Sequence, residues 1–311
     1  MVLNKYLIHL WGLVCLSILA GCATAPAGAP QTSLPAVNEP AVVAPPPVLM
    51  RPPRLGLALG GGAARGFAHV GVIQVLEQAG IRPDVVAGTS AGSLVAALYA
   101  SGMTSARLEQ VALEMEEAAL TDWSLPLFGR GVLRGDALAR YVSRAVDGRP
   151  IEQLPMPLGV LATDLRTGQG VLFRRGDTAQ AVRASSAVPG VFSPVRVGQT
   201  EYVDGGLVAP VPVRQTRDMG AEVVLAVDIS SAPEGNPSNG SLQVLLQTFA
   251  IMGQSINRHE LLAADLVVRP ALAGVGGADF SARQRAIEAG RQAMRAALPQ
   301  LRMHLAKQKP L

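Results

Sequence analysis

The sequence predicts an α/β protein with a mainly parallel central sheet. Two consecutive units of the same type support this prediction. In the first, the apolar run 55–59 enters a glycine-rich loop at 60–66, and a helical pattern follows. In the second, the apolar, β-branched run 84–87 enters the turn 88–92, which is again followed by a helical pattern. Strands joined by such a crossover are parallel, and their following loops start at one edge of the sheet. We therefore expect the two loops to lie side by side.

The second loop has a serine at its centre. Gly88 and Gly92 flank Ser90 in the pattern G-x-S-x-G. Glycines let the chain turn sharply and let strand and helix approach each other closely. This geometry exposes the hydroxyl at the start of a helix, where main-chain N–H groups stabilise negative charge. The pattern therefore makes Ser90 a candidate nucleophile.

The first loop does not fit a nucleotide site. A dinucleotide fingerprint requires a glycine where Arg65 stands, and a phosphate-binding loop requires Lys-Ser or Lys-Thr, whereas Phe67 follows Gly66. No acidic residue ends the next strand to bind a ribose. We expect neither a nucleotide nor another cofactor, and we interpret the loop as a source of N–H donors beside Ser90.

A candidate base follows a later strand. The predicted strand 200–203 ends in Asp204, Gly205 and Gly206. A carboxylate at this position could accept the proton of Ser90 and activate a hydroxyl that is a weak nucleophile when neutral. By itself the Asp-Gly pair is also a common hairpin signal. Asp204 is therefore a candidate base or a turn residue.

Taken together, these segments resemble the bacterial members of the patatin-like phospholipase family. The likeness covers about residues 55–230 and keeps the family's motif order, which is Gly60 to Gly66, Gly88 to Gly92, and Asp204-Gly205-Gly206. The segments 162–165 and 186–192 also look like bacterial members. The resemblance implies a three-layer α/β/α fold and a Ser-Asp dyad that hydrolyses acyl esters of lipids.

The resemblance assigns roles residue by residue. It implies that Ser90 is the nucleophile and Asp204 the base, and that the substrate is a phospholipid or another acyl-ester lipid. Its oxyanion hole falls on the N–H groups of Gly61, Gly62 and Ala63, followed by Arg65 as a basic residue near the phosphate or the oxyanion. Plant members have a third glycine where this chain has Ala63. No metal is expected, because no His/Asp cluster has ligand spacing.

Three alternative functions remain open. A conventional α/β-hydrolase could use Ser90, Asp204 or Asp228, and His259, although only one strand precedes the strand of the serine. An acyltransferase could use the same dyad with an alcohol acceptor. A non-catalytic lipid-binding lipoprotein could keep the fold. His69 lies one helical turn after Arg65, and we expect it to have a structural role.

Residues 1–21 are predicted to be a lipoprotein signal peptide. Lys5 precedes an apolar stretch at 7–19, and the segment closes with Leu-Ala-Gly-Cys at 19–22. This end resembles a lipobox, which implies a lipid-anchored, acylated (palmitate-bearing) Cys22. Residue 23 is Ala rather than Asp. The resemblance therefore implies anchoring in the outer membrane of a bacterial cell envelope, facing the periplasm.

The remaining chain divides into a tether and one catalytic domain. Nine prolines between residues 23 and 53 remove the N–H donors that sheets and helices need, so 22–53 is expected to be an extended tether. Residues 54–311 are long enough for one domain. We expect helices at 105–119, 136–145 and 282–309, and strands at 158–163, 170–173 and 222–228. The last helix is amphipathic and basic and could pack on the core or contact lipid. The loop 120–134 could be a lid or a crossover.

The charge of the chain argues against a nucleic acid partner. The net charge is +4, and removal of Lys5 with the signal peptide leaves +3. This charge is small and dispersed along the chain.

Overall fold

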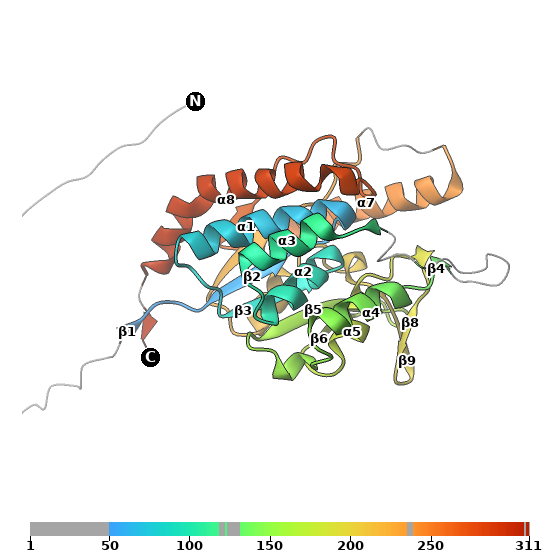
Figure 1. Ribbon diagram of the computed structural model, residues 1–311, viewed down its shortest axis with the longest axis horizontal. Helices are drawn as coiled ribbons and strands as arrows, with labels where there is room; N and C mark the ends of the chain where they lie inside the picture. The colour runs from blue at the N-terminus through green and yellow to red at the C-terminus, as the bar shows by residue number, and fades with distance from the viewer. Residues whose placement is uncertain (1–49, 118–121, 123–130, 235–238, 308, 311) are drawn as a thin grey trace, which may run out of the picture. The chain divides into compact units, whose positions relative to one another are not determined.

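A computed structural model describes residues 50–117, 122, 131–234, 239–307 and 309–310. The predicted signal peptide, Cys22, most of the tether and most of the predicted lid fall outside the described residues. Within them, an eight-stranded sheet has the order β11-β10-β2-β3-β5-β9-β8, and β6 pairs with β5 (Figure 1).

Five strands of this sheet are parallel to one another. They are β11 (Leu266–Val268), β10 (Val223–Val227), β2 (Leu55–Leu59), β3 (Val85–Thr89) and β5 (Leu158–Asp164). The antiparallel strands are β9 (Thr200–Asp204), β8 (Val195–Val197) and β6 (Gly170–Phe173). Every residue of β2, β3 and β10 is buried, because helices cover both faces of the parallel part. The predicted α/β class with a mainly parallel sheet is confirmed.

The two faces of the sheet belong to different core clusters. Leu57 and Leu59 of β2 pack with α1 (Phe67–Gln78), α2 (Ala91–Ala100), α3 (Ser105–Glu114) and α8 (Arg283–Leu305). Ala58 points to the opposite face and packs with α6 (Val213–Asp218) and the residues that follow α7 (Ser241–Glu260). This alternation follows from the two-residue period of a strand. The result is the predicted three-layer α/β/α arrangement.

Helix α8 packs against α1 through two glycines. A Cβ at Gly71 would lie 1.9 Å from the carbonyl oxygen of Ile287, and a Cβ at Gly290 would lie 2.0 Å from that of Ala68. The apolar stripe expected along this helix faces the core, where Ile287, Met294 and Leu301 are buried. Of the two roles left open for the stripe, core packing is therefore the observed one.

Several elements differ from the sequence-based expectations. The helix expected at 105–119 ends at Glu114. The next residue, Met115, has an extended backbone and is buried in the core. Helix α4 (Asp136–Ala145) has the expected bounds. Elements that were not expected are α5 (Thr178–Ser185), β8, β11 and the two-stranded sheet of β4 (Gly131–Leu133) and β7 (Gly190–Phe192). A two-stranded sheet also joins β1 (Met50–Arg51) to β12 (Lys309–Pro310).

Among the described residues, no helix is both long enough and apolar enough to cross a membrane.

Candidate active site

Ser90 occupies a strained turn between β3 and α2. Its backbone has φ 53° and ψ −125°, a region that non-glycine residues rarely adopt. A Cβ at Gly88 would lie 2.4 Å from the carbonyl oxygen of Gly92, and one at Gly92 would lie 2.2 Å from that of Leu59. Only glycine fits at these two positions. The strand-turn-helix unit expected around Ser90 is present, with β3 before the serine and α2 after it.

Hydrogen bonds from two other serines hold this turn. The main-chain N–H of Ser90 donates to Oγ of Ser185 at 2.9 Å, and the Ser185 hydroxyl donates to the carbonyl oxygen of Leu161 at 2.6 Å. The Ser93 hydroxyl donates to the carbonyl oxygen of Ser90 at 2.6 Å. Ser185 is fully buried. It ties the turn to β5, and no local sequence pattern indicates this contact.

Asp204 lies at the end of β9 with its side chain buried. Its Oδ1 accepts a hydrogen bond from the Gly206 N–H at 2.7 Å, and its carbonyl oxygen accepts one from the Thr163 hydroxyl at 2.8 Å. A Cβ at Gly205 would lie 2.2 Å from the carbonyl oxygen of Leu161. Only 7 % of Asp204 is exposed, so its position is closely fixed.

Ser90 and Asp204 lie close to each other. Burial raises the pKa of Asp204 to about 6, while the Ser90 hydroxyl and the Gly206 N–H lower it. The second carboxylate oxygen, Oδ2, is buried and has no hydrogen-bond partner of standard geometry among the described residues. One carboxylate oxygen is therefore free to accept a proton.

The glycine-rich loop offers fewer N–H donors than the sequence suggested. The N–H of Gly61 donates to the carbonyl oxygen of Pro210 at 2.9 Å, and that of Arg65 donates to Gly62 at 3.2 Å. These two N–H groups are occupied, which corrects the expectation that Gly61 supplies a donor. A Cβ at Gly61 would lie 3.1 Å from Cβ of Ser90, so this glycine instead permits the close approach of the loop to the serine.

Two N–H groups in the loop are left for a ligand. Those of Gly62 and Ala63 have no acceptor among the described residues. Ala63 has φ 51°, a conformation that glycine adopts with less strain. This is the position at which plant members of the family resembled by the sequence have glycine. The loop therefore presents two adjacent N–H donors near Ser90.

His69 contacts the glycine-rich loop, and Arg65 is part of it. His69 is buried, and its Nε2 lies 2.8 Å from the carbonyl oxygen of Gly60. Burial lowers its pKa to about 4, so the ring is neutral at pH 7 and holds the loop, in the structural role expected. Nε of Arg65 is buried without a hydrogen-bond partner among the described residues, and burial lowers the pKa of this guanidinium.

The residues of the alternative triad are not brought together. His259 is exposed on α7 and is not among the described residues that line the cavity at Ser90. Asp228 is held by Arg269 at 3.2 Å and by the N–H of Ser230 at 3.1 Å. Asp164 accepts the N–H groups of Arg166 and Thr167 and caps a turn. Among the described candidates for the acid or base, Asp204 is therefore the one that lies next to Ser90.

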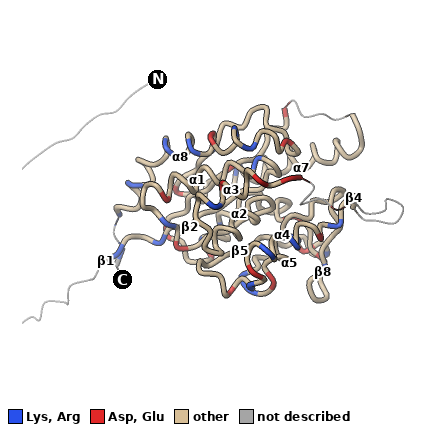
Figure 2. Tube along the Cα trace, in the orientation of Figure 1, with Lys and Arg blue, Asp and Glu red and all other residues tan. Residues whose placement is uncertain are grey.

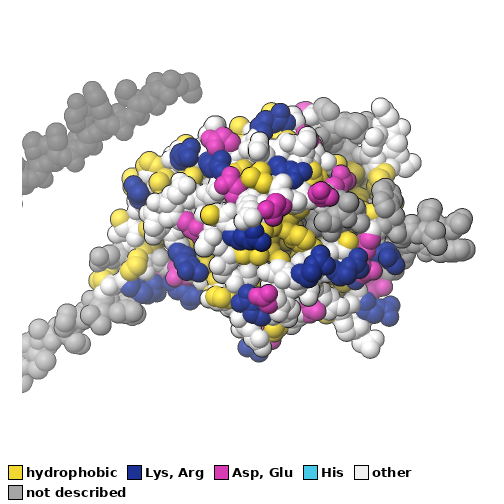
Figure 3. Space-filling model, viewed as in Figure 1, with side chains coloured by type: hydrophobic (Ala, Val, Ile, Leu, Met, Phe, Trp, Pro, Cys, Tyr) yellow, Lys and Arg dark blue, Asp and Glu magenta, His cyan; other side chains and the backbone are white. Residues whose placement is uncertain are grey.

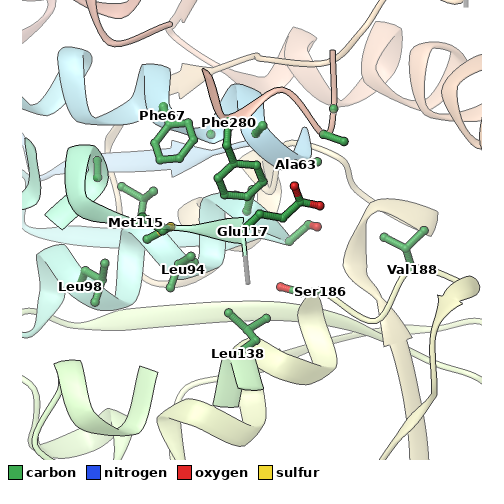
Figure 4. Close-up of a pocket in the computed structure, with 18 of the residues that line it drawn as sticks. Ala63, Phe67, Leu94, Leu98, Met115, Glu117, Leu138, Ser186, Val188 and Phe280 are labelled. Atoms are coloured by element: carbon green, nitrogen blue, oxygen red, sulfur yellow. The ribbon is translucent and has the colours of Figure 1, made fainter. Parts of the chain in front are cut away.

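A cavity of about 290 Å³ opens beside Ser90. Figure 4 shows Phe67 and Phe280 on one side of it, Leu94, Leu98 and Leu138 on the other, and the Ser186 hydroxyl pointing inward. Glu117 is the one charged residue among the described lining residues. In Figure 3 hydrophobic side chains gather at the centre of the visible face, where α2, α3 and α4 meet. An apolar cavity beside a serine hydroxyl has the chemistry to hold an acyl chain.

The comparisons with known sequences agree on one family. Residues 57–217 match the family model described as patatin-like phospholipase. Two uncharacterized NTE family proteins of Mycobacterium tuberculosis are 36 % identical over 183 residues and 32 % identical over 272 residues. The first alignment covers 59 % of this chain and 51 % of the relative, and the second covers 78 % and 46 %. The chain thus spans about half the length of these curated relatives.

A mammalian protein and a solved structure are similar as well. Patatin-like phospholipase domain-containing protein 6 of Mus musculus is 33 % identical over 188 residues, covering 58 % of this chain and 14 % of that protein. The crystal structure of VipD from Legionella pneumophila superposes with a TM-score of 0.54 at 15 % identity, covering 83 % of this chain and 72 % of that one. The likeness to VipD concerns the fold.

Proposed function

Because this chain belongs to the patatin-like phospholipase family, we propose that it hydrolyses acyl esters of lipids with Ser90 as nucleophile and Asp204 as base. The single observation that carries this proposal is the meeting of the two side chains. A strained serine turn and a buried carboxyl with one free oxygen come together next to an apolar cavity.

In the first step, Oγ of Ser90 attacks the ester carbonyl carbon while Asp204 accepts the hydroxyl proton. The developing oxyanion accepts hydrogen bonds from the N–H groups of Gly62 and Ala63, and the start of α2 adds a favourable dipole. Collapse of the tetrahedral intermediate breaks the bond to the alcohol, which leaves with the proton from Asp204. The fatty acyl group is then esterified to Ser90, with its chain in the cavity.

In the second step, water attacks the acyl-serine. Asp204 accepts a proton from this water and returns it to Oγ of Ser90 when the fatty acid leaves. A base whose pKa is raised to about 6 binds protons more strongly than an ordinary aspartate but is still ionised at pH 7. Arg65, which is part of the loop, adds positive charge that favours the oxyanion without lining the cavity.

Hydrolysis by the full chain and three variants tests this function. With lysophosphatidylcholine as substrate, we expect the wild type and His259→Ala to release fatty acid and Ser90→Ala and Asp204→Asn to release none. Loss of activity in His259→Ala, with folding intact by circular dichroism, would favour the triad. Label that moves from the substrate to another lipid would indicate an acyltransferase, and a folded, inactive wild type would indicate a lipid-binding protein.

The cellular location is a separate proposal, since residues 1–49 lie outside the described part. The segment ending in Cys22 supports a lipid-anchored protein of the bacterial envelope, on the periplasmic face of the outer membrane. Growth with radiolabelled palmitate should label the wild type and leave Cys22→Ser unlabelled. Equal labelling of both would contradict anchoring through Cys22.

A further inference from the structure

Helix α7 exposes an unusual number of apolar side chains. We call Leu242, Val244, Leu245, Leu246, Ile251 and Met252 the α7 apolar surface; their exposed fractions run from 37 % for Leu245 to 53 % for Ile251. In Figure 1 this helix, coloured orange, extends to the edge of the domain. Its C-terminal end is held by Glu260, which accepts the Arg214 N–H at 2.9 Å, and by Asn257, which bonds Ser230 at 3.1 Å.

These side chains form a wide apolar face that covers more than half of the helix circumference, and Gln243, Gln247 and Gln254 share the remaining side. Val244 and Ile251 are seven residues apart and share a side, whereas Leu242 and Leu245 lie on other sides of the helix. No Asp, Glu, Lys or Arg occurs between residues 241 and 257, and this part of the helix is tan in Figure 2. A helix with such a wide apolar face normally buries that face in a core or in lipid. In this fold, an apolar environment for α7 must come from outside the described chain.

The α7 apolar surface adjoins the wall of the cavity at Ser90. Cδ2 of Leu245 lies 2.7 Å, and Cδ1 of Leu242 lies 3.5 Å, from the point that a Cβ of Gly190 would occupy. The next two residues, Val191 and Phe192, line the cavity. The exposed apolar helix and the apolar cavity are therefore separated by a single strand, β7.

We propose that the α7 apolar surface inserts into the interfacial region of a lipid bilayer and there holds the cavity against the membrane. This inference rests on the proposed function, because it supplies a path for an acyl chain. A chain that moves from the bilayer past α7 into the cavity stays next to apolar side chains and avoids exposure to water. A second copy of this chain would also cover the surface, but it would block this path to the cavity.

Because this part of α7 carries no charge, its binding to lipid should depend little on salt or on anionic lipid. Insertion driven by apolar burial does not need anionic lipid and survives high salt, whereas attraction between charges is screened. We therefore expect binding to uncharged phosphatidylcholine vesicles at low and at high salt. Neutral side chains such as Gln243 and Gln247 suit the polar headgroup region next to the inserted residues.

A fluorescent probe on the helix tests insertion directly. In the full chain with Cys15→Ser and Cys22→Ser, an environment-sensitive NBD label is attached to Ile251→Cys. The matched control carries the label at Met303→Cys on α8, where the native side chain is 64 % exposed. With phosphatidylcholine vesicles we expect a blue shift and a several-fold rise in emission at position 251, at either salt concentration, and no change at 303. No response at 251, or a response lost at high salt, would overturn the proposal.

A double variant tests the consequence for activity. Val244→Ser with Ile251→Ser removes two strongly exposed apolar side chains that do not line the cavity. We expect unchanged hydrolysis of a soluble short-chain ester and about tenfold slower hydrolysis of vesicle lipid. Met303→Ser is the control and should leave both rates unchanged. Equal effects on both substrates, or no effect on vesicle lipid, would contradict a membrane role.

Two further outcomes separate this inference from its alternatives. A dimer detected by light scattering that the double variant dissociates, with no probe response to vesicles, would assign the surface to a second copy and overturn the proposal. If the proposed function is wrong, the wild type and Ser90→Ala will hydrolyse the soluble ester equally slowly. The probe at position 251 reports on insertion independently of that result.

Discussion

The main-chain N–H of Ser90 donates a hydrogen bond to the hydroxyl of Ser185, 95 residues further along the chain. The same hydroxyl donates to Leu161 of β5, so Ser185 links the strained serine turn to the centre of the sheet. A backbone conformation that is rare for a serine persists only where its surroundings hold it. The backbone geometry of Ser90 therefore depends on Ser185, which is not among the described residues that line the cavity.

Replacing Ser185 by Ala should reduce activity more than a comparable serine replacement elsewhere. Loss of the hydroxyl leaves two buried main-chain groups unpaired and should cost about 1–3 kcal/mol of unfolding free energy. The freed turn should lower kcat about tenfold or more. The control is Ser101→Ala, which removes a buried hydroxyl bonded within its own helix region to Leu98 and should leave kcat unchanged. Equal kcat values for both variants would show that Ser185 does not position Ser90.

The pH profile should report the ionisation of Asp204. Because burial raises the pKa of this carboxyl to about 6, the base is protonated and inactive below that pH. For a soluble ester, kcat/KM should fall about tenfold per pH unit below pH 6 and should level off above it. His69→Asn should show the same fall in kcat/KM below pH 6, because burial lowers the pKa of His69 to about 4. A limb near pH 4 in the wild type would contradict Asp204 as the base.

Asp204 should also make stability depend on pH. The pKa of the carboxyl is 3.8 in the exposed reference state and about 6 in the fold, so the folded state binds more protons between these values. The contribution of Asp204 to the stability of the wild type should therefore fall as the pH rises from about 4 to about 6. Asp204→Asn removes this pH-dependent loss, so the unfolding free energy of the variant minus that of the wild type should grow by roughly 2.5 kcal/mol between pH 4 and pH 8. Urea titrations at both pH values measure it; a constant difference would contradict a raised pKa.

The crossing of α1 and α8 should not tolerate a methyl group. Gly71→Ala would place a Cβ 1.9 Å from the Ile287 carbonyl oxygen, so the helices must separate, at a cost of about 2 kcal/mol or more. Gly253→Ala in α7 is the matched control, because its Cβ would have only an ordinary contact at 3.5 Å with Pro210. That variant should keep or gain up to about 1 kcal/mol. Similar urea midpoints for both variants would contradict the close crossing.

The parts of this fold that sequence predicts are those that local pattern determines. The strand 55–59 is an uninterrupted apolar run, and Gly88 and Gly92 around Ser90 indicate their own turn. The position of Asp204 is partly predictable, because a carboxylate ends a strand there. Its meeting with Ser90 depends on the antiparallel pairing of Ala162 with Asp204, which no local pattern indicates.

Contacts between distant segments account for what the sequence could not show. The N–H of Gly61 is occupied because Pro210 happens to lie opposite it, which leaves Gly62 and Ala63 as the donors. The apolar residues of α7 cannot be distinguished from those of a core helix by sequence alone. Their exposure is known only from the fold. These contacts and exposures depend on which elements pack together, and local patterns in one sequence do not reveal that packing.

The proposed mechanism requires Ser90 to form the covalent acyl intermediate. The most direct measurement treats the full chain with a fluorophosphonate and locates the adduct by mass spectrometry of its peptides. We expect one adduct, on Ser90, which is absent in Ser90→Ala and in Asp204→Asn and retained in His259→Ala. An adduct on Ser186, whose hydroxyl also points into the cavity, or labelling that persists in Ser90→Ala, would contradict it.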